Sequence, residues 1–349
     1  MRNVRWTDLL LRLAAVGLAL LFTTLILIAS GAPPLQAFGN ILSGSFGSIG
    51  KISDVLSAWV PLMLVSAGLL ITFSAGLWNI GIEGQIMLGA IFTTGMMRIL
   101  QDSGLPPALV IGLSVLAGML GGALWAALAG ALKTFGGVNE IFGGLGLNFV
   151  ATAITLWLIF GPWKRPGVAS MSGTVPFDTS LWLSTFPGLR LSPWALGLSL
   201  LSVVFVYFLL RGTYFGLRLK AVGRNPHASY LFGIPTWQYM MLAFILCGAL
   251  GGLAGAMQVT GVYHRLIPSI SSGYGFMGLM VGMLVNYHPL WAAPVAVFFA
   301  ALNIGSIQLP IVLRLDSSLA GVLQGVLVLF VLLADGARQK YFSRKGTSS

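Results

Sequence analysis

Long apolar runs, separated by short polar loops, occupy most of the sequence. Only 8% of the 349 residues are charged and 57% are hydrophobic, whereas a soluble domain carries about 25% charged residues. A chain this apolar cannot cover a water-facing surface. Runs of helical length favour α-helices over the short alternating strands of a membrane β-barrel. The sequence therefore predicts an all-α integral membrane protein.

The apolar runs divide into ten expected spans. The first is interpreted as an uncleaved span, not a signal peptide, because its apolar part is long for a signal. Residues 31–54 are expected to be a Gly/Ser-rich loop, residues 1–334 a single transmembrane domain, and residues 335–349 a basic tail. The expected spans cover residues 9–30, 55–76, 85–97, 108–132, a fifth run ending near 160, 193–210, 236–262, 273–286, 290–308 and 319–334.

The positive charges predict the orientation of the chain. Ten spans place both termini on one side, and 12 of the 19 Lys and Arg residues fall on that side, which leaves 7 on the other. The excess assigns both termini to the cytoplasm. The net charge of +11 is then explained by lipid anchoring and topology, without nucleic acid. The 12 residues are Arg2, Arg5, Arg12, Lys133, Arg211, Arg218, Lys220, Arg224, Arg338, Lys340, Arg344 and Lys345.

The order of spans and glycine-rich breaks also suggests an internal repeat. The second and third spans flank one break, and the seventh and eighth flank another. Spans 2–5 and 7–10 would then run in opposite senses, as in the inverted repeats of many transporters.

The polar stretch 79–90 interrupts two apolar runs and contains Glu83, flanked by Asn79 and Gln85. A carboxylate among apolar residues is costly unless it faces protein or a water-filled path. These three side chains are therefore candidates for lining a substrate pathway. Two other interpretations stay open. The side chains cap broken helix ends, or the stretch is a short turn between two spans and Glu83 is exposed to solvent.

A second glycine-broken stretch, 134–148, contains Asn139, Glu140 and Asn148. The same two functions, pathway lining and helix capping, apply to Asn139 and Glu140. Capping is the stronger interpretation there, because two glycines precede them. In-span amides such as Asn148 often only join neighbouring helices.

The basic loop between the sixth and seventh spans predicts a short helix of about two turns. Asn225 can cap it, Pro226 can occupy its first position, and Gly233 can end it. Its first turn, formed by His227, Ala228 and Ser229, is expected to be exposed. Such a rigid knob suits docking of a soluble partner; the alternative is a solvated loop. The proposed docking set is Gly223, Arg224, Asn225, Pro226, His227, Ala228 and Gly233.

Several function classes are excluded or weakened by missing motifs. The nucleotide-binding motif G-x-x-x-x-G-K-[ST] does not occur, so the chain does not itself hydrolyse ATP. The protease motif H-E-x-x-H does not occur either, so nothing indicates a metalloprotease. The one cysteine, Cys247, and the three scattered histidines offer no metal-ligand spacing. A transporter driven by a partner ATPase, an ion-coupled transporter and a channel are left, with the channel third because no filter sequence is evident.

Three motifs carry a family resemblance: 79–90, 137–141 together with Leu147-Asn148, and 221–234. They resemble permease subunits of bacterial ABC importers of the ribose/branched-chain amino acid permease superfamily. The resemblance is strongest to nucleoside and simple-sugar permeases that work with a Bmp-type lipoprotein. This chain has Ala228-Ser229 where the family pattern leads us to expect Ala-Ala, a small-for-small change.

The resemblance implies a fold of ten helices with an inverted repeat, in the bacterial cytoplasmic membrane. It also implies a coupling helix between the sixth and seventh spans. The implied partners are a cytoplasmic ATPase that binds ATP and Mg²⁺, a second homologous permease and an extracytoplasmic solute-binding lipoprotein. No cofactor is expected on this chain. The alternative is a stand-alone secondary transporter that uses Glu83 and Glu140 as proton or ion sites.

Overall fold

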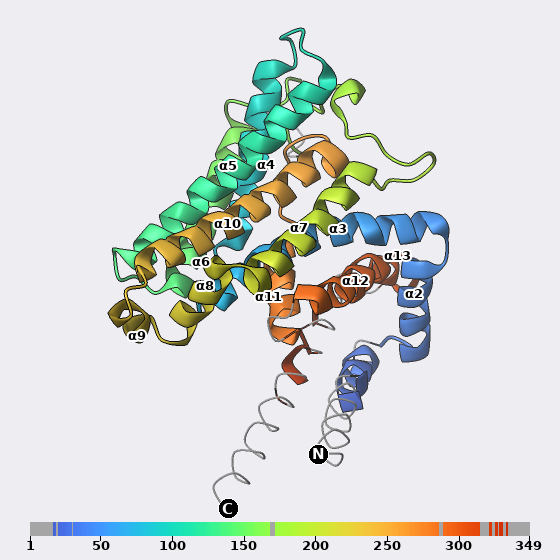
Figure 1. Cartoon of the computed structure of the whole chain (residues 1–349). Coiled ribbons are helices and arrows are strands. Elements are labelled where there is room, and N and C mark those ends of the chain that lie inside the picture. Colours follow the sequence, from blue (N-terminus) through green and yellow to red (C-terminus); the bar gives the residue numbers. More distant parts are fainter. Residues whose placement is uncertain are drawn as a thin grey trace, which may run out of the picture. The chain divides into compact units, whose positions relative to one another are not determined.

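A computed structural model describes residues 17–18, 20–29, 31–167, 172–285, 289–314, 321–322, 325–326, 328–330 and 333. In these ranges the chain forms helices joined by loops, drawn in Figure 1. It divides into two compact units, residues 1–55 with 298–349, and residues 56–297. The expected basic tail, 335–349, lies outside the described residues.

In the unit formed by the two ends of the chain, the expected loop over residues 31–54 is wrong. Residues 31–54 do not form a loop, because α2 occupies Pro34–Phe46 and α3 begins at Ile49. Pro34 stands at the start of α2, where a missing N–H costs nothing. The Gly/Ser residues are packing residues: Ser45 donates to the Ala301 carbonyl over 2.6 Å, and a Cβ on Gly44 would lie 2.8 Å from the Gly305 oxygen.

The larger unit holds most of the helices. Its first helix is the body of α3 (Ile49–Ser74) and its last is the beginning of α12 (Pro289–Ser306). Between them lie α4 (Ile82–Leu100), α5 (Pro107–Thr134), α6 (Glu140–Phe160), η1 (Thr179–Leu181), α7 (Pro193–Gly212), α8 (Tyr214–Arg224), α9 (Pro226–Leu231), α10 (Thr236–Met257), the π-helix η2 (Gln258–Tyr263) and α11 (Tyr274–Leu284).

The most extensive helix contact in this unit is between α5 and α10, and both also pack on α4 (Figure 1). Glycines make the approach possible. A Cβ on Gly122 would lie 2.6 Å from the Gly252 Cα, and one on Gly252 would lie 3.1 Å from the Gly122 Cα. The small-xxx-small spacing of Gly118 with Gly122 and of Gly248 with Gly252 thus produces the tight contact typical of membrane helices.

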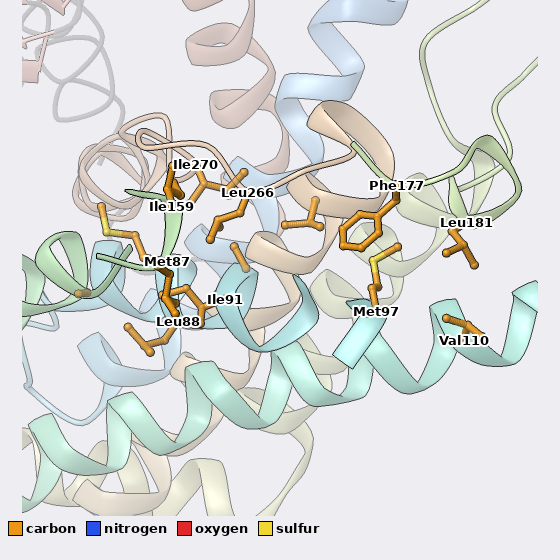
Figure 2. Close-up of a cluster of buried hydrophobic side chains, with 14 residues drawn as sticks. Met87, Leu88, Ile91, Met97, Val110, Ile159, Phe177, Leu181, Leu266 and Ile270 are labelled. Carbon is orange, nitrogen blue, oxygen red and sulfur yellow. The ribbon is translucent and has the colours of Figure 1, made fainter. Parts of the chain in front are cut away.

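A cluster of buried apolar side chains anchors two long loops to α4 (Figure 2). Met87 and Ile91 project from α4 toward Leu266 and Ile270, which follow η2. Phe177 belongs to the same cluster and comes from the loop between α6 and α7. Backbone pairing supports it, since the Phe177 N–H donates to the His264 carbonyl over 2.9 Å. These loops are therefore part of the packed core.

Six described helices are long and apolar enough to cross a membrane, and a seventh span results if the bent pair Leu20–Ala29 and Pro34–Phe46 counts as one. This confirms an all-helical membrane protein. Every expected span from the second to the ninth contains a helix, although α4 and α11 are not among the six. Half of the tenth expected span lies outside the described residues. The count of ten, the repeat and the orientation stay predictions.

Candidate functional site

The break between α3 and α4 is the centre of the candidate site. Gly76, with φ of +70°, turns the chain out of α3 in a conformation that suits glycine. The following residues to Gly81 have no regular structure longer than a turn. Asn79, in the middle, is only 1% exposed. A buried irregular segment needs partners for its polar groups, and the neighbouring side chains supply them.

Two of the predicted side chains pair with each other. The Asn79 amide nitrogen donates to the Gln85 oxygen over 3.1 Å, and the Gln85 nitrogen donates back to the Asn79 oxygen over 3.0 Å. The Asn79 nitrogen also donates to the Cys247 sulfur of α10 over 3.1 Å. Since Gln85 is fully buried, this amide pair holds the break in shape.

Asn148 clamps the same break from α6. Its side-chain oxygen accepts the Gly84 N–H over 2.8 Å, and its nitrogen donates to the Ile80 carbonyl over 3.0 Å. Gly144, one turn earlier, permits the approach, because a Cβ there would lie 2.6 Å from the Gly81 nitrogen. Asn148 thus satisfies two backbone groups that the interrupted helix leaves unpaired.

Glu83 caps a different helix, α11. One carboxylate oxygen accepts the Gly273 N–H over 3.1 Å and the other accepts the Gly275 N–H over 2.7 Å. The side chain is 6% exposed. An anion is stabilised at a helix N-terminus because free N–H groups and the helix dipole both face it. Sequence reasoning missed this partner segment, and the glycines offer no side-chain signal that could have revealed it.

The second predicted segment reaches the same break. Asn139 is exposed and accepts the Ile141 N–H over 2.9 Å, so it caps α6. Glu140 forms an ion pair with Lys133 over 2.6 Å. Its carboxylate also lies within hydrogen-bonding reach of the Trp78 N–H, in the break itself. The structure therefore gathers Asn79, Glu83, Gln85, Glu140 and Asn148 around one interruption.

The loop after α7 contains the predicted short helix, which is α9. Asn225 caps it by accepting the Ala228 N–H over 3.0 Å, Pro226 is its first residue, and Gly233 follows its end with φ of +79°. The prediction of an exposed Ser229 is wrong, because Ser229 is 5% exposed.

Helix geometry explains the error at Ser229. Residues three and four positions apart share a helix face, so His227, Tyr230 and Leu231 point together. Tyr230 is 65% and Leu231 is 72% exposed, and the next residue, Phe232, is 86% exposed. The exposed surface of α9 is therefore more apolar than its first turn suggests.

The preceding helix, α8, is fixed to the ends of two spans. The Lys220 ammonium donates to the Leu210 carbonyl at the end of α7 over 2.5 Å, and burial lowers the pKa of Lys220. At the other end of α8, Gly223 contacts the backbone of Ser74 and Gly76. Within the described residues, no cluster of three or more His, Cys, Asp or Glu side chains could hold a metal ion.

Comparison with known proteins identifies the family. The model of the family described as "Branched-chain amino acid transport system / permease component" matches residues 51–332. The chain belongs to this family. It is a multi-pass membrane permease of the ABC transporter type, and thus a transport subunit, not an enzyme. Permeases of this type work with an ATPase and a binding protein.

Three relatives cover nearly the whole chain. A glucose ABC transporter permease protein of Haloferax volcanii is 27% identical over 88% of this chain and 83% of the relative. The guanosine ABC transporter permease protein NupP of Bacillus subtilis is 26% identical over 94% of each chain. The nucleoside ABC transporter permease protein NupB of Lactococcus lactis is 26% identical over 87% of this chain and 85% of the relative.

Proposed function

We propose that this permease forms the translocation pathway for a nucleoside or a simple sugar in an ATP-driven importer. The names of the relatives support a neutral polar substrate. The observation that carries the proposal is the position of Glu83. The N-terminus of a broken helix is where a transporter can bind an anionic substrate group, and at α11 an internal carboxylate already occupies that position.

The polar residues around the break are proposed to border the pathway. Asn79, Gln85 and Asn148 hold the interrupted backbone through the bonds described above. We therefore assign them the role of shaping the pathway wall, together with Glu83, Asn139 and Glu140. Cysteine substitutions across 79–85 and 139–148 test this, because small polar thiol reagents should reach positions that border the pathway. If none of these cysteines reacted with the reagents, the polar residues would have only a packing role.

Uptake competition tests the substrate class directly. Lipid vesicles that contain the permease, its ATPase and its solute-binding protein should transport labelled guanosine or glucose toward the side where the ATPase is bound, when ATP is supplied on that side. Excess unlabelled nucleoside or sugar should compete, and excess leucine should not. Competition by leucine alone would overturn the assignment of a nucleoside or sugar substrate. Uptake that stops with an ionophore but continues without ATP would instead support the ion-coupled alternative.

The proposed partners are a cytoplasmic ATPase that binds ATP and Mg²⁺, a second homologous permease and a solute-binding lipoprotein. The docking element for the ATPase is α9, with Gly223, Arg224, Asn225, Pro226, His227, Ala228 and Gly233. Its exposed Tyr230 and Leu231 supply the aromatic and apolar contacts that often dominate interface energy.

A charge placed on α9 tests the docking element. Ala228→Arg should reduce co-purification of the ATPase, since a few kcal/mol at an interface centre can break a modest contact. Gln238→Arg adds the same charge at the exposed start of α10 and should leave the complex intact. A complex that survives Ala228→Arg with normal uptake would remove α9 from the docking interface.

The proposed topology has ten spans, both termini in the cytoplasm and an inverted repeat of spans 2–5 and 7–10. Residues 1–334 form the permease domain in this proposal, followed by the basic tail 335–349. A reporter fused after Ser180 should then be extracytoplasmic, and one after Asn225 cytoplasmic. The opposite location at either position would overturn the orientation.

A further inference from the structure

The contact between α8 and the end of α3 joins two backbones directly. A Cβ on Gly223 would lie 2.9 Å from the Gly76 nitrogen and 2.9 Å from the Ala75 carbonyl carbon. In the reverse direction, a Cβ on Gly76 would lie 2.8 Å from the Gly223 oxygen. No side chain separates the two segments, so a displacement of one must move the other or open the contact.

Asn225 connects α8 rigidly to α9. Its backbone N–H donates to the Ala221 carbonyl over 3.1 Å and closes α8, while its side-chain oxygen accepts the Ala228 N–H over 3.0 Å and opens α9. One residue therefore ends the first helix and caps the second, and no flexible linker lies between them. The contact of Gly223 is two residues before this junction.

Buried side chains hold the segment beyond Gly76 at two points on the way to α11. Asn79, three residues on, is paired with Gln85 and bonded to Cys247. Glu83 then holds the N-terminus of α11. The break that follows Gly76 is therefore fixed to α4 and α10 by the bonds of Asn79, and the first turn of α4 is fixed to α11 by Glu83.

We propose that the Gly76–Gly223 backbone contact transmits movement of α9 to the break between α3 and α4, and through Glu83 to α11. This inference rests on the proposed function, in which α9 is the element that the ATPase moves. Gly223 and Gly76 are positioning residues in this scheme. They contact no substrate, and their role is to keep α8 against the segment that shapes the pathway.

A matched pair of glycine substitutions tests the proposal. Gly223→Ala inserts a methyl group at the contact and forces the two backbones apart. Gly212→Ala, at the end of α7, meets nothing closer than the Phe208 ring at 3.8 Å. Each variant is reconstituted in vesicles with the ATPase and the binding protein, and uptake and ATP hydrolysis are measured on the same sample.

The methyl group added by Gly223→Ala points at Ala75 and Gly76 and not outward toward a partner, so we expect the variant to keep the ATPase bound through α9 and to hydrolyse ATP. It should transport at least about fivefold less substrate per ATP, which is the lower end of typical coupling between two sites. Gly212→Ala should match the wild type. An unchanged transport ratio in Gly223→Ala would overturn the inference. Wild-type permease that fails to bind an ATPase would instead overturn the proposed function, so the two failures are distinguishable.

Cys247, the only cysteine in the chain, provides a readout that a purely structural defect would not change in the same way. It is buried and bonded to Asn79. Vanadate trapping of the wild-type complex should change the rate at which N-ethylmaleimide labels Cys247, measured on its peptide by mass spectrometry. In Gly223→Ala the resting rate should equal the wild-type rate and the change on trapping should disappear. A change of wild-type size in Gly223→Ala, or a resting rate raised to that of the unfolded chain, would overturn the transmission role.

Discussion

Removal of the Glu83 carboxylate should destabilise the permease strongly. Glu83→Ala leaves the N–H groups of Gly273 and Gly275 without their acceptor. The first N–H groups of a helix have no partner inside that helix. The Gly275 N–H is buried and the Gly273 N–H is half-buried, so water does not readily replace the carboxylate there. The substitution therefore deprives the start of α11 of its main polar contact.

The size of the loss follows from the number of groups left unpaired. Each buried donor without a partner costs about 1–3 kcal/mol, so two cost about 2–6 kcal/mol. Glu83→Gln should cost less, because its carbonyl can still accept one N–H while its amide group faces the other. Asp178 offers a matched control, since it accepts the Ser180 N–H over 2.8 Å but is exposed. Asp178→Ala should cost less than either Glu83 variant, because water can replace the lost acceptor at this exposed position.

Thermal unfolding of the purified permease in detergent measures these differences. The melting temperature should fall in the order wild type, Asp178→Ala, Glu83→Gln and Glu83→Ala, and uptake should follow the same order. A Glu83→Ala protein as stable as Asp178→Ala would refute the reasoning, because it would mean that water or another group satisfies α11 equally well.

Three further predictions concern packing, pH and capping. Gly252→Val should prevent folding or greatly lower expression by separating α5 from α10, whereas Gly112→Val, where a Cβ meets nothing within 4 Å, should express normally. Burial lowers the pKa of His264, so its contribution to stability should be complete above its ordinary pKa of about 6.5 and decline as the pH falls below it. Melting temperatures measured from pH 8 to 5 should fall in the wild type and in His227→Gln, and should fall less in His264→Phe. Asn225→Ala should weaken α9 by about 0.5–2 kcal/mol, seen as faster hydrogen exchange in 226–231, and exchange at the wild-type rate would contradict the capping role.

The helices were largely predictable because the membrane imposes a strong pattern on sequence. A hydrocarbon environment requires long apolar runs with internally satisfied backbones, and these are visible without a structure. Local chemistry was equally informative at α9, where Asn225 and Pro226 marked the start of the helix where the structure has it. The small-xxx-small spacing of glycines in α5 and in α10 is likewise a local signal of tight packing, although it does not identify the partner helix.

The partners of the site residues were not predictable, since they depend on contacts between distant segments. Glu83 bonds backbone groups 190 and 192 positions away, and a backbone N–H looks the same at every residue in a sequence. α2 was mistaken for a loop because Gly and Ser mark loops in soluble proteins but close helix contacts in membranes. Ser229 was misplaced because the face that α9 turns to the protein depends on tertiary packing.

The positions of the two glutamates bear on how transport is driven. An ion-coupled carrier needs a carboxylate that can bind and release its ion during the cycle. Both oxygens of Glu83 hold the start of α11, so release would also undo that helix end. Glu140 is paired with Lys133 and faces Trp78. With both glutamates engaged in maintaining the fold, the energy for transport is better supplied from outside the chain, which agrees with the proposal that an ATPase docks on the exposed, capped helix α9.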